Sequence, residues 1–193
     1  MSYLKKVQNL KNQKKKKAFD NCINIVNISI PSSVTEIGRL SFFSCWSLAK
    51  IIIPSSVISI DQGAFAGSNL SESITFENHS SLKKIGEYAF KSSLLKEIEI
   101  PPNVTSIEKG AFCECKLLEK ITFKQPSSLI TIGDNSFENC SSLTQVTLPS
   151  IVTAIGNDAF KGCSHESFEV LREEKSEQNQ NNEGNEKSNC LIF

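Results

Sequence analysis

Apolar and polar positions alternate along the chain in a phrase that returns six times, at intervals of 22 to 25 residues. Each phrase opens with a short Ile-x-Ile stretch, and the openings fall at Ile28, Ile51, Ile74, Ile98, Ile121 and Val146. An apolar-polar-apolar stretch is typical of a short strand that buries one face. Tandem repeats of this length predict a solenoid, in which each coil stacks only on its neighbours.

Two further apolar positions recur in every phrase and predict the core. An aliphatic position follows the strand and holds Ile37, Ile60, Ile85, Ile107, Ile132 and Ile155. An aromatic position comes next, directly after Ala or Ser, and holds Phe42, Phe65, Phe90, Phe112, Phe137 and Phe160. Because the small residue beside each ring lets neighbouring coils approach closely, we expect the rings to stack into one continuous core.

The corner after each strand comes in two forms. In four repeats a proline ends the strand, since it has no N–H to extend a ladder: Pro31, Pro54, Pro101 and Pro149. Repeats three and five instead read Phe76-Glu77-Asn78-His79-Ser80-Ser81-Leu82 and Phe123-Lys124-Gln125-Pro126-Ser127-Ser128-Leu129. Each of these corners is longer before its Ile-Gly, and we expect both insertions to form surface loops.

The full pattern, Ile-Pro-x-x-Val-x-x-Ile-Gly-x-x-Ala-Phe-x-x-Cys-x-x-Leu, resembles the BspA-like subclass of leucine-rich repeat proteins over roughly residues 18–170. The resemblance implies a curved right-handed solenoid with a parallel β-sheet on one side. It also implies a role in protein interaction or adhesion, with no catalytic residues and no cofactor. We therefore expect an α/β-type repeat solenoid with stacked coils and little regular helix.

The charge distribution divides the chain into four parts. Residues 1–17 form a basic arm with seven lysines and no acid, and apolar residues on one face of 2–12 predict a short capping helix. Residues 18–171 form the solenoid, with about six full repeats and partial end coils; Phe168 to Val170 reads as a last strand. Residues 172–189 form an acidic, polar linker that is predicted to be disordered. Residues 190–193 are a separate motif.

That motif, Cys190-Leu191-Ile192-Phe193, has the C-a-a-X form that directs prenylation of the cysteine. We predict that a prenyltransferase modifies Cys190 and that the isoprenoid holds the chain on the cytosolic face of a membrane, by preference the plasma membrane. The run Lys14, Lys15, Lys16 and Lys17 either adds attraction to anionic lipids or acts as a nuclear-localisation-like signal.

Two alternatives to membrane anchoring remain open. Polar residues interrupt the stretch after the lysines, so no secretory signal is predicted. An adhesin exported without a signal peptide would expose five glycosylation sequons, at Asn27, Asn69, Asn78, Asn103 and Asn139. A soluble intracellular regulatory or adaptor subunit would need neither export nor prenylation.

Protein partners of unknown identity are expected on the outward positions of the strands, as on the concave surfaces of other solenoids. The candidate positions are Lys50, Ile52, Thr75, Glu97, Glu99, Lys120, Thr122, Gln145 and Thr147. Trp46 is predicted to pack partly at a coil edge, with partner binding as the second interpretation. The basic arm has almost no interleaved aromatic residues and the body has no basic stripe, so nucleic-acid binding is not expected.

The sequence contains no pattern typical of catalysis or metal binding. His79 and His165 have no spacing that suggests a triad or a ligand pair, and no glycine-rich phosphate loop is present. Five cysteines share one repeat position: Cys22, Cys45, Cys115, Cys140 and Cys163. Stacked coils would place them near disulfide distance, but reduced structural thiols are the favoured interpretation. Cys113 is predicted to face the surface.

Overall fold

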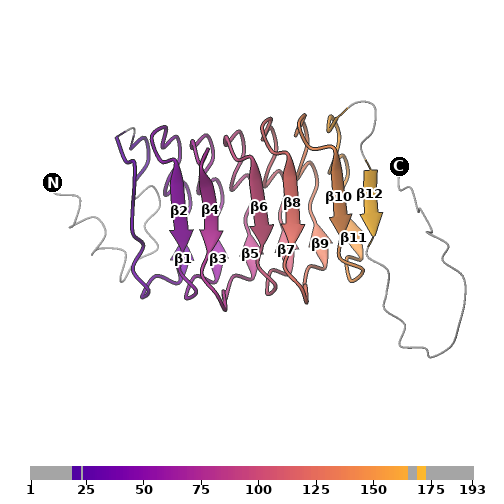
Figure 1. The fold of residues 1–193 in the computed structure, drawn as a ribbon, viewed down its shortest axis with the longest axis horizontal. Coiled ribbons are helices and arrows are strands. Elements are labelled where there is room, and N and C mark those ends of the chain that lie inside the picture. The colour runs from indigo at the N-terminus through magenta and orange to yellow at the C-terminus, as the bar shows by residue number, and fades with distance from the viewer. Residues whose placement is uncertain (1–18, 23, 165–168, 173–193) are drawn as a thin grey trace, which may run out of the picture.

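The computed structural model describes residues 19–22, 24–164 and 169–172, which form stacked coils of a β-solenoid (Figure 1). All regular elements in these ranges are strands, and all strand pairs are parallel. This arrangement confirms the predicted solenoid with little helix. In the same ranges, no helix has the length and apolar character needed to cross a membrane.

Five four-residue strands match the predicted stretches that open at Ile51, Ile74, Ile98, Ile121 and Val146, and a sixth matches the predicted last strand near Val170, whereas the stretch at Ile28 is not a strand. These strands are β2 (Lys50–Ile53), β4 (Ser73–Phe76), β6 (Glu97–Ile100), β8 (Lys120–Phe123), β10 (Gln145–Leu148) and β12 (Glu169–Arg172). They pair two by two, β2 with β4, β6 with β8 and β10 with β12. In β2, β6 and β10 exposed and buried residues alternate, as the pattern predicts for strands with one buried face.

A second strand in each coil has only two residues and ends at the recurring isoleucine. These strands are β1 (Glu36–Ile37), β3 (Ser59–Ile60), β5 (Lys84–Ile85), β7 (Ser106–Ile107), β9 (Thr131–Ile132) and β11 (Ala154–Ile155). They form one continuous six-stranded sheet in chain order. The repeat pattern indicated only a core position in this segment, so it did not predict the second sheet.

The glycine after the recurring isoleucine sets how closely the coils approach on this side. A Cβ atom on Gly86 would lie 2.7 Å from the Ile60 carbonyl oxygen, and one on Gly133 would lie 2.6 Å from the Lys109 nitrogen. Both neighbours are backbone atoms of the preceding coil, so they cannot move aside as a flexible side chain would. Glycine therefore permits the close approach of the coils at these positions, whereas coils two and four hold Asp61 and Glu108 there.

The core is the predicted ladder of phenylalanine rings, which runs from Phe19 to Phe160. Successive ring centroids lie 5.1 to 5.3 Å apart, with interplanar angles of 2 to 8°. The turn around each ring is tied to the next coil through backbone hydrogen bonds, such as Phe65 N–H to the Ala89 carbonyl at 2.7 Å. The stacked rings and these bonds together join each coil to its neighbours along the solenoid axis.

Candidate interaction surface

The nine residues predicted for partner binding lie on the outward positions of the four-residue strands. Eight of them are exposed or partly exposed at the sheet surface, and Thr122 is half-buried. Ile52 is 59% exposed, and Trp46, at a turn of the preceding repeat, is 60% exposed. More than half of the Trp46 surface is therefore available to a partner. The strands place the candidate residues on one face, which we call the strand face.

Charge on the strand face gathers on its middle strands. Glu97 lies opposite Lys120 in the register of β6 and β8, and Glu99 lies opposite Thr122. β2 and β4 instead place Ile52 opposite Thr75. The strand face thus carries an exposed isoleucine and one lysine near its N-terminal end and several charges of both signs at its centre, so the two regions suit different partner chemistry.

Next to its centre the strand face is hollowed by a cavity of about 570 Å³, which we call the notch. It lies over the short corner of repeat four, between coils three and five, whose corners are longer. Coil three contributes Ile74 to Ser80, coil four contributes Glu99 and Pro101 to Asn103, and coil five contributes Lys124. Cavities of this size are typical of ligand-binding sites.

Hydrogen bonds from neighbouring coils hold the walls of the notch in place. The Ser55 N–H donates to Glu77 Oε2 at 2.9 Å, which ties the first long corner to the coil before it. Asn103 Nδ2 donates to the Ser80 carbonyl at 2.8 Å, which ties the same corner to the coil after it. The Ser128 N–H donates to the Pro102 carbonyl at 2.9 Å and fixes the second long corner. The notch is therefore preformed.

Five polar side chains in the notch are available to a ligand, the amide of Asn78 and four others. Among the residues that the structure describes, the side chains of Thr75, His79, Glu99 and Lys124 make no hydrogen bond and no ion pair. Together they offer a hydroxyl, an imidazole, a carboxylate and an ammonium group. Pro101 and Pro102 lie between the two walls and have no N–H. The notch can thus bind a ligand through side chains of both charges over an apolar base.

The sequence pattern identified only part of the notch. Thr75 and Glu99 were predicted from the strand pattern, and the other seven candidates lie outside the lining. His79 had no predicted role, while Lys124 and the two prolines were missed. The signal that could have found them is the extra length of the corners in repeats three and five, which leaves the corner between them recessed.

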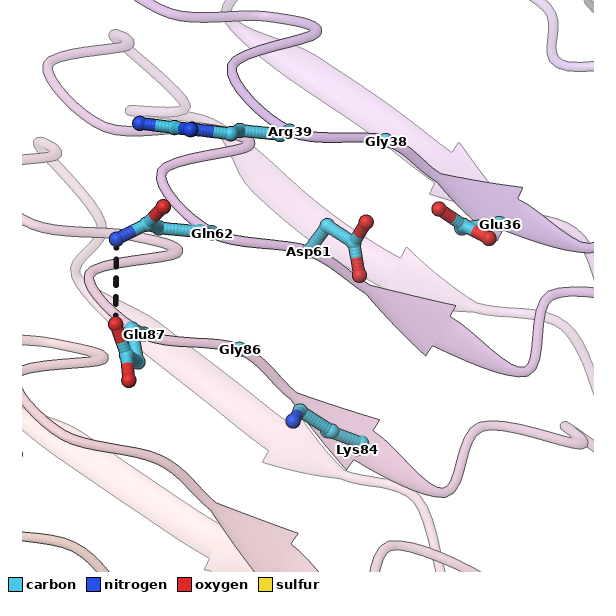
Figure 2. Close-up of a pocket in the computed structure, with 8 residues that line it drawn as sticks. All are labelled: Glu36, Gly38, Arg39, Asp61, Gln62, Lys84, Gly86 and Glu87. Carbon is cyan, nitrogen blue, oxygen red and sulfur yellow. Dashed lines mark hydrogen bonds between the residues drawn. The ribbon is translucent and has the colours of Figure 1, made fainter. Parts of the chain in front are cut away.

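A second depression, of about 470 Å³, lies over β1, β3 and β5, where Gly38 and Gly86 flank Asp61 (Figure 2). Gln62 Nε2 donates to Glu87 Oε2 at 3.2 Å within it. Its charged groups are spread over three coils and do not converge on one point in Figure 2. In the described part of the chain, no group of three or more His, Cys, Asp or Glu side chains could hold a metal ion.

Four of the five repeated cysteines are buried structural groups, and Cys22 is partly exposed. Each of the four buried thiols donates to the carbonyl of a phenylalanine in the preceding coil: Cys45 to Phe19 at 3.2 Å, Cys115 to Phe90 at 3.0 Å, Cys140 to Phe112 at 3.1 Å and Cys163 to Phe137 at 3.3 Å. All six cysteines in the described ranges are free thiols. Burial raises the pKa of Cys45 to about 11 and that of Cys163 to about 12. Protonated, buried thiols are poor nucleophiles, so Cys45 and Cys163 are structural rather than reactive.

The prediction for Cys113 was wrong. Its side chain is buried, with 6% of its surface exposed, and burial raises its pKa. The residue directly follows Phe112 in the turn, where the chain bends back over the core. The predictions for the basic arm, including Lys14 to Lys17, and for Cys190 to Phe193 fall outside the described residues.

A family model of the BspA type leucine rich repeat region, in six copies, matches residues 12–127 and 118–183. The chain belongs to the BspA-type leucine-rich repeat family. Its resemblance to this family, first seen in the repeat pattern, is confirmed. A search of curated proteins found no match.

Among solved structures, this family member is similar to the pneumococcal vaccine antigen PcpA, with 32% identity and a TM-score of 0.68 over 78% of this chain. It is also similar to the leucine-rich repeat protein TpLRR of T. pallidum, with 31% identity and a TM-score of 0.47 over 76% of this chain. A leucine-rich repeat protein from Bacteroides ovatus shares 24% identity, with a TM-score of 0.46 over 82% of this chain and 58% of its own. The chain spans 39% of PcpA and 55% of TpLRR.

Proposed function

We propose that this chain is a scaffold that binds other proteins through its strand face and the adjoining notch. The observation that carries the proposal is the preformed notch, in which Thr75, His79, Glu99 and Lys124 have no partner within the described ranges. Rigid walls reduce the entropy lost on binding, and unpaired polar groups supply specificity. No catalytic step is part of this function.

The similarity to PcpA supports a role outside the cell. That protein is described as a vaccine antigen, and antibodies must reach such an antigen. An exposed adhesin would use the strand face to hold a protein of another cell or of a surrounding matrix.

A second candidate location rests on the motif Cys190-Leu191-Ile192-Phe193. A prenylated Cys190 would place the same scaffold on the cytosolic face of a membrane. A single isoprenoid gives reversible attachment, and the lysines at Lys14 to Lys17 would strengthen it on an anionic leaflet. The partner would then be a membrane-associated protein of the cytosol.

Site-specific photo-crosslinking tests the scaffold function in the native cells. A photoreactive residue at Glu97 is expected to capture a partner of one defined mass, and unlabelled protein is expected to compete with the capture. The matched control carries the photoreactive residue at Lys109, which lies just beyond β7 of the other sheet. Equal capture from Glu97 and Lys109, or none from either, would refute binding through the strand face.

Intact-mass measurement of the protein from its native cells separates the two locations. The cytosolic candidate predicts loss of the last three residues, addition of a C20 isoprenoid and a methyl ester, and pelleting with membranes that a Cys190→Ser variant abolishes. The extracellular candidate predicts an unmodified Cys190 and labelling of intact cells by an antibody to the strand face. A protein that remains in the cytosol without modification would contradict both locations.

A further inference from the structure

We infer that the notch binds one extended segment of the partner protein, in which a basic and an acidic side chain are separated by a single residue. This inference rests on the proposed scaffold function and specifies the chemistry of its partner. Three observations support the inference: the width of the notch, the register of its two unpaired charged residues, and the absence of backbone N–H groups at Pro101 and Pro102 between its walls.

The width of the notch fits one extended chain. Its walls belong to coils three and five, and coil four lies between them. Neighbouring strands are about 4.7 to 4.9 Å apart, so walls two coils apart are separated by roughly 9 to 10 Å. An extended chain between the two walls needs about one strand spacing to each wall, which matches this separation. A helix, with a diameter of about 10 to 12 Å including its side chains, is too wide.

The charges in the notch define what the segment must carry. Glu77 also lines the notch, but its carboxylate already accepts the Ser55 N–H. Glu99 and Lys124 are the remaining charged residues of the lining, and neither has an ion-pair partner in the described ranges. An occupant with a cation facing Glu99 and an anion facing Lys124 would satisfy both.

The register fixes the spacing between those two charges. Glu99 on β6 lies opposite Thr122 on β8, and Lys124 follows two residues later. At about 3.3 Å per residue, Lys124 is therefore roughly 6.6 Å further along the strand direction than Glu99. In an extended ligand, side chains at positions i and i+2 point to the same side with the same separation. A basic-x-acidic segment parallel to β6, or an acidic-x-basic segment antiparallel to it, matches both charges.

The base of the notch excludes recognition by an added strand. Pro101 and Pro102 lack the N–H groups that would bond to a ligand backbone. Recognition therefore depends on the two charged side chains, with the hydroxyl of Thr75 and the imidazole of His79 beside them. The middle residue of the segment points away from the notch, so its identity is free.

Peptide titration of the ¹⁵N-labelled full chain, followed by NMR, tests the inference. The first probe is the acetylated peptide Gly-Ser-Arg-Thr-Glu-Ser-Gly. It is compared with a neutral peptide that has Gln in place of Arg and Glu, and with one that has two residues between the charges. The first probe is expected to shift the amides of Glu99 and Lys124. Since each exposed ion pair contributes about 1.4- to 5-fold in affinity, it should bind roughly 2- to 25-fold more tightly than the neutral peptide.

Single charge reversals give a sharper readout because each predicts a different preferred peptide. Glu99→Lys makes both charges positive and should favour the Glu-x-Glu peptide. Lys124→Glu makes both negative and should favour Arg-x-Arg. The matched control Glu119→Lys reverses an exposed glutamate outside the notch lining and should keep the original preference.

Three results would overturn the inference: equal affinity for the charged and neutral peptides, no effect of the spacing, or a control variant that behaves like Glu99→Lys. Absence of binding at millimolar peptide would also overturn it. The outcome is separable from that of the scaffold function. If Glu97 still captures a partner and Glu99→Lys leaves that capture unchanged, the scaffold stands and the peptide chemistry of the notch does not.

Discussion

The phenylalanine ladder makes the stability of this solenoid sensitive to where a ring is removed. Phe90 is fully buried, and its ring stacks on Phe65 at 5.3 Å and on Phe112 at 5.1 Å. Phe19, at the N-terminal end of the ladder, stacks on Phe42 at 5.2 Å and on no other described ring. We therefore compare Phe90→Leu with Phe19→Leu, since both changes keep an apolar side chain and remove the aromatic contacts.

The expected magnitudes follow from the number of stacked neighbours. An aromatic pair contributes about 0.5 to 1.5 kcal/mol beyond the area it buries, so Phe90→Leu loses about 1 to 3 kcal/mol from its two pairs. The smaller side chain leaves a cavity of about 20 Å³, which adds about 0.5 kcal/mol at about 24 cal/mol per Å³. Phe19→Leu loses one pair and should be less destabilising by about 0.5 to 1.5 kcal/mol.

Urea unfolding followed by far-UV circular dichroism measures the difference, because the slope with denaturant shows whether both variants still unfold as one unit. An unchanged slope permits direct comparison of the free energies of unfolding. A reduced slope for Phe90→Leu alone would indicate that the solenoid separates into two halves at the weakened coil. Equal destabilisation by the two variants, with equal slopes, would refute the view that stacking between coils adds to simple burial.

Three further predictions concern the close approach of the coils and the buried thiols. Gly133→Ala places a Cβ 2.6 Å from the Lys109 nitrogen and should lower the free energy of unfolding by about 1 to 3 kcal/mol. The control is Asp61→Ala, at the equivalent position of coil two, which already holds a Cβ. It should have little effect in the same urea assay. In the folded protein Cys45 and Cys163 should not react with Ellman's reagent at about pH 8, and rapid reaction of either would show that the coil opens. Burial raises the pKa of Cys45 from 9.0 to about 11 and that of Cys163 to about 12. The stability that these thiols add is therefore present below pH 9.0 and is lost as pH rises through the pKa values of the folded protein. A Cys45→Ala variant should show a smaller decrease of melting temperature at alkaline pH than the parent chain.

The repeat pattern predicted the core well, because each core position recurs in successive coils under the same packing constraint. Alignment of the repeats alone puts Phe65, Phe90 and Phe112 in one column, and the stacking of their rings follows from that alignment. The two-residue strands were missed for a physical reason. A strand such as Lys84–Ile85 is too short to show alternation, and Gly86 after it permits the close approach of the neighbouring coil. Cys113 was misplaced because it lies outside the recurring cysteine position, so the repeat pattern did not indicate that its side chain is buried.

The notch could not be predicted by the same reasoning, because it arises from a difference between coils instead of a shared feature. Repetition accounts for positions that all coils hold in common, and these are the inward ones. Glu99 and Lys124 occupy outward positions where the residue type changes from coil to coil, and only the unequal corner lengths bring them to one cavity. In a solenoid, departures from the repeat are therefore the places to look for binding, since they alone distinguish one coil from the next. The inserted corners of repeats three and five follow this rule, because each is held in place by bonds from its neighbours while five polar side chains at the notch remain unpaired in the described chain.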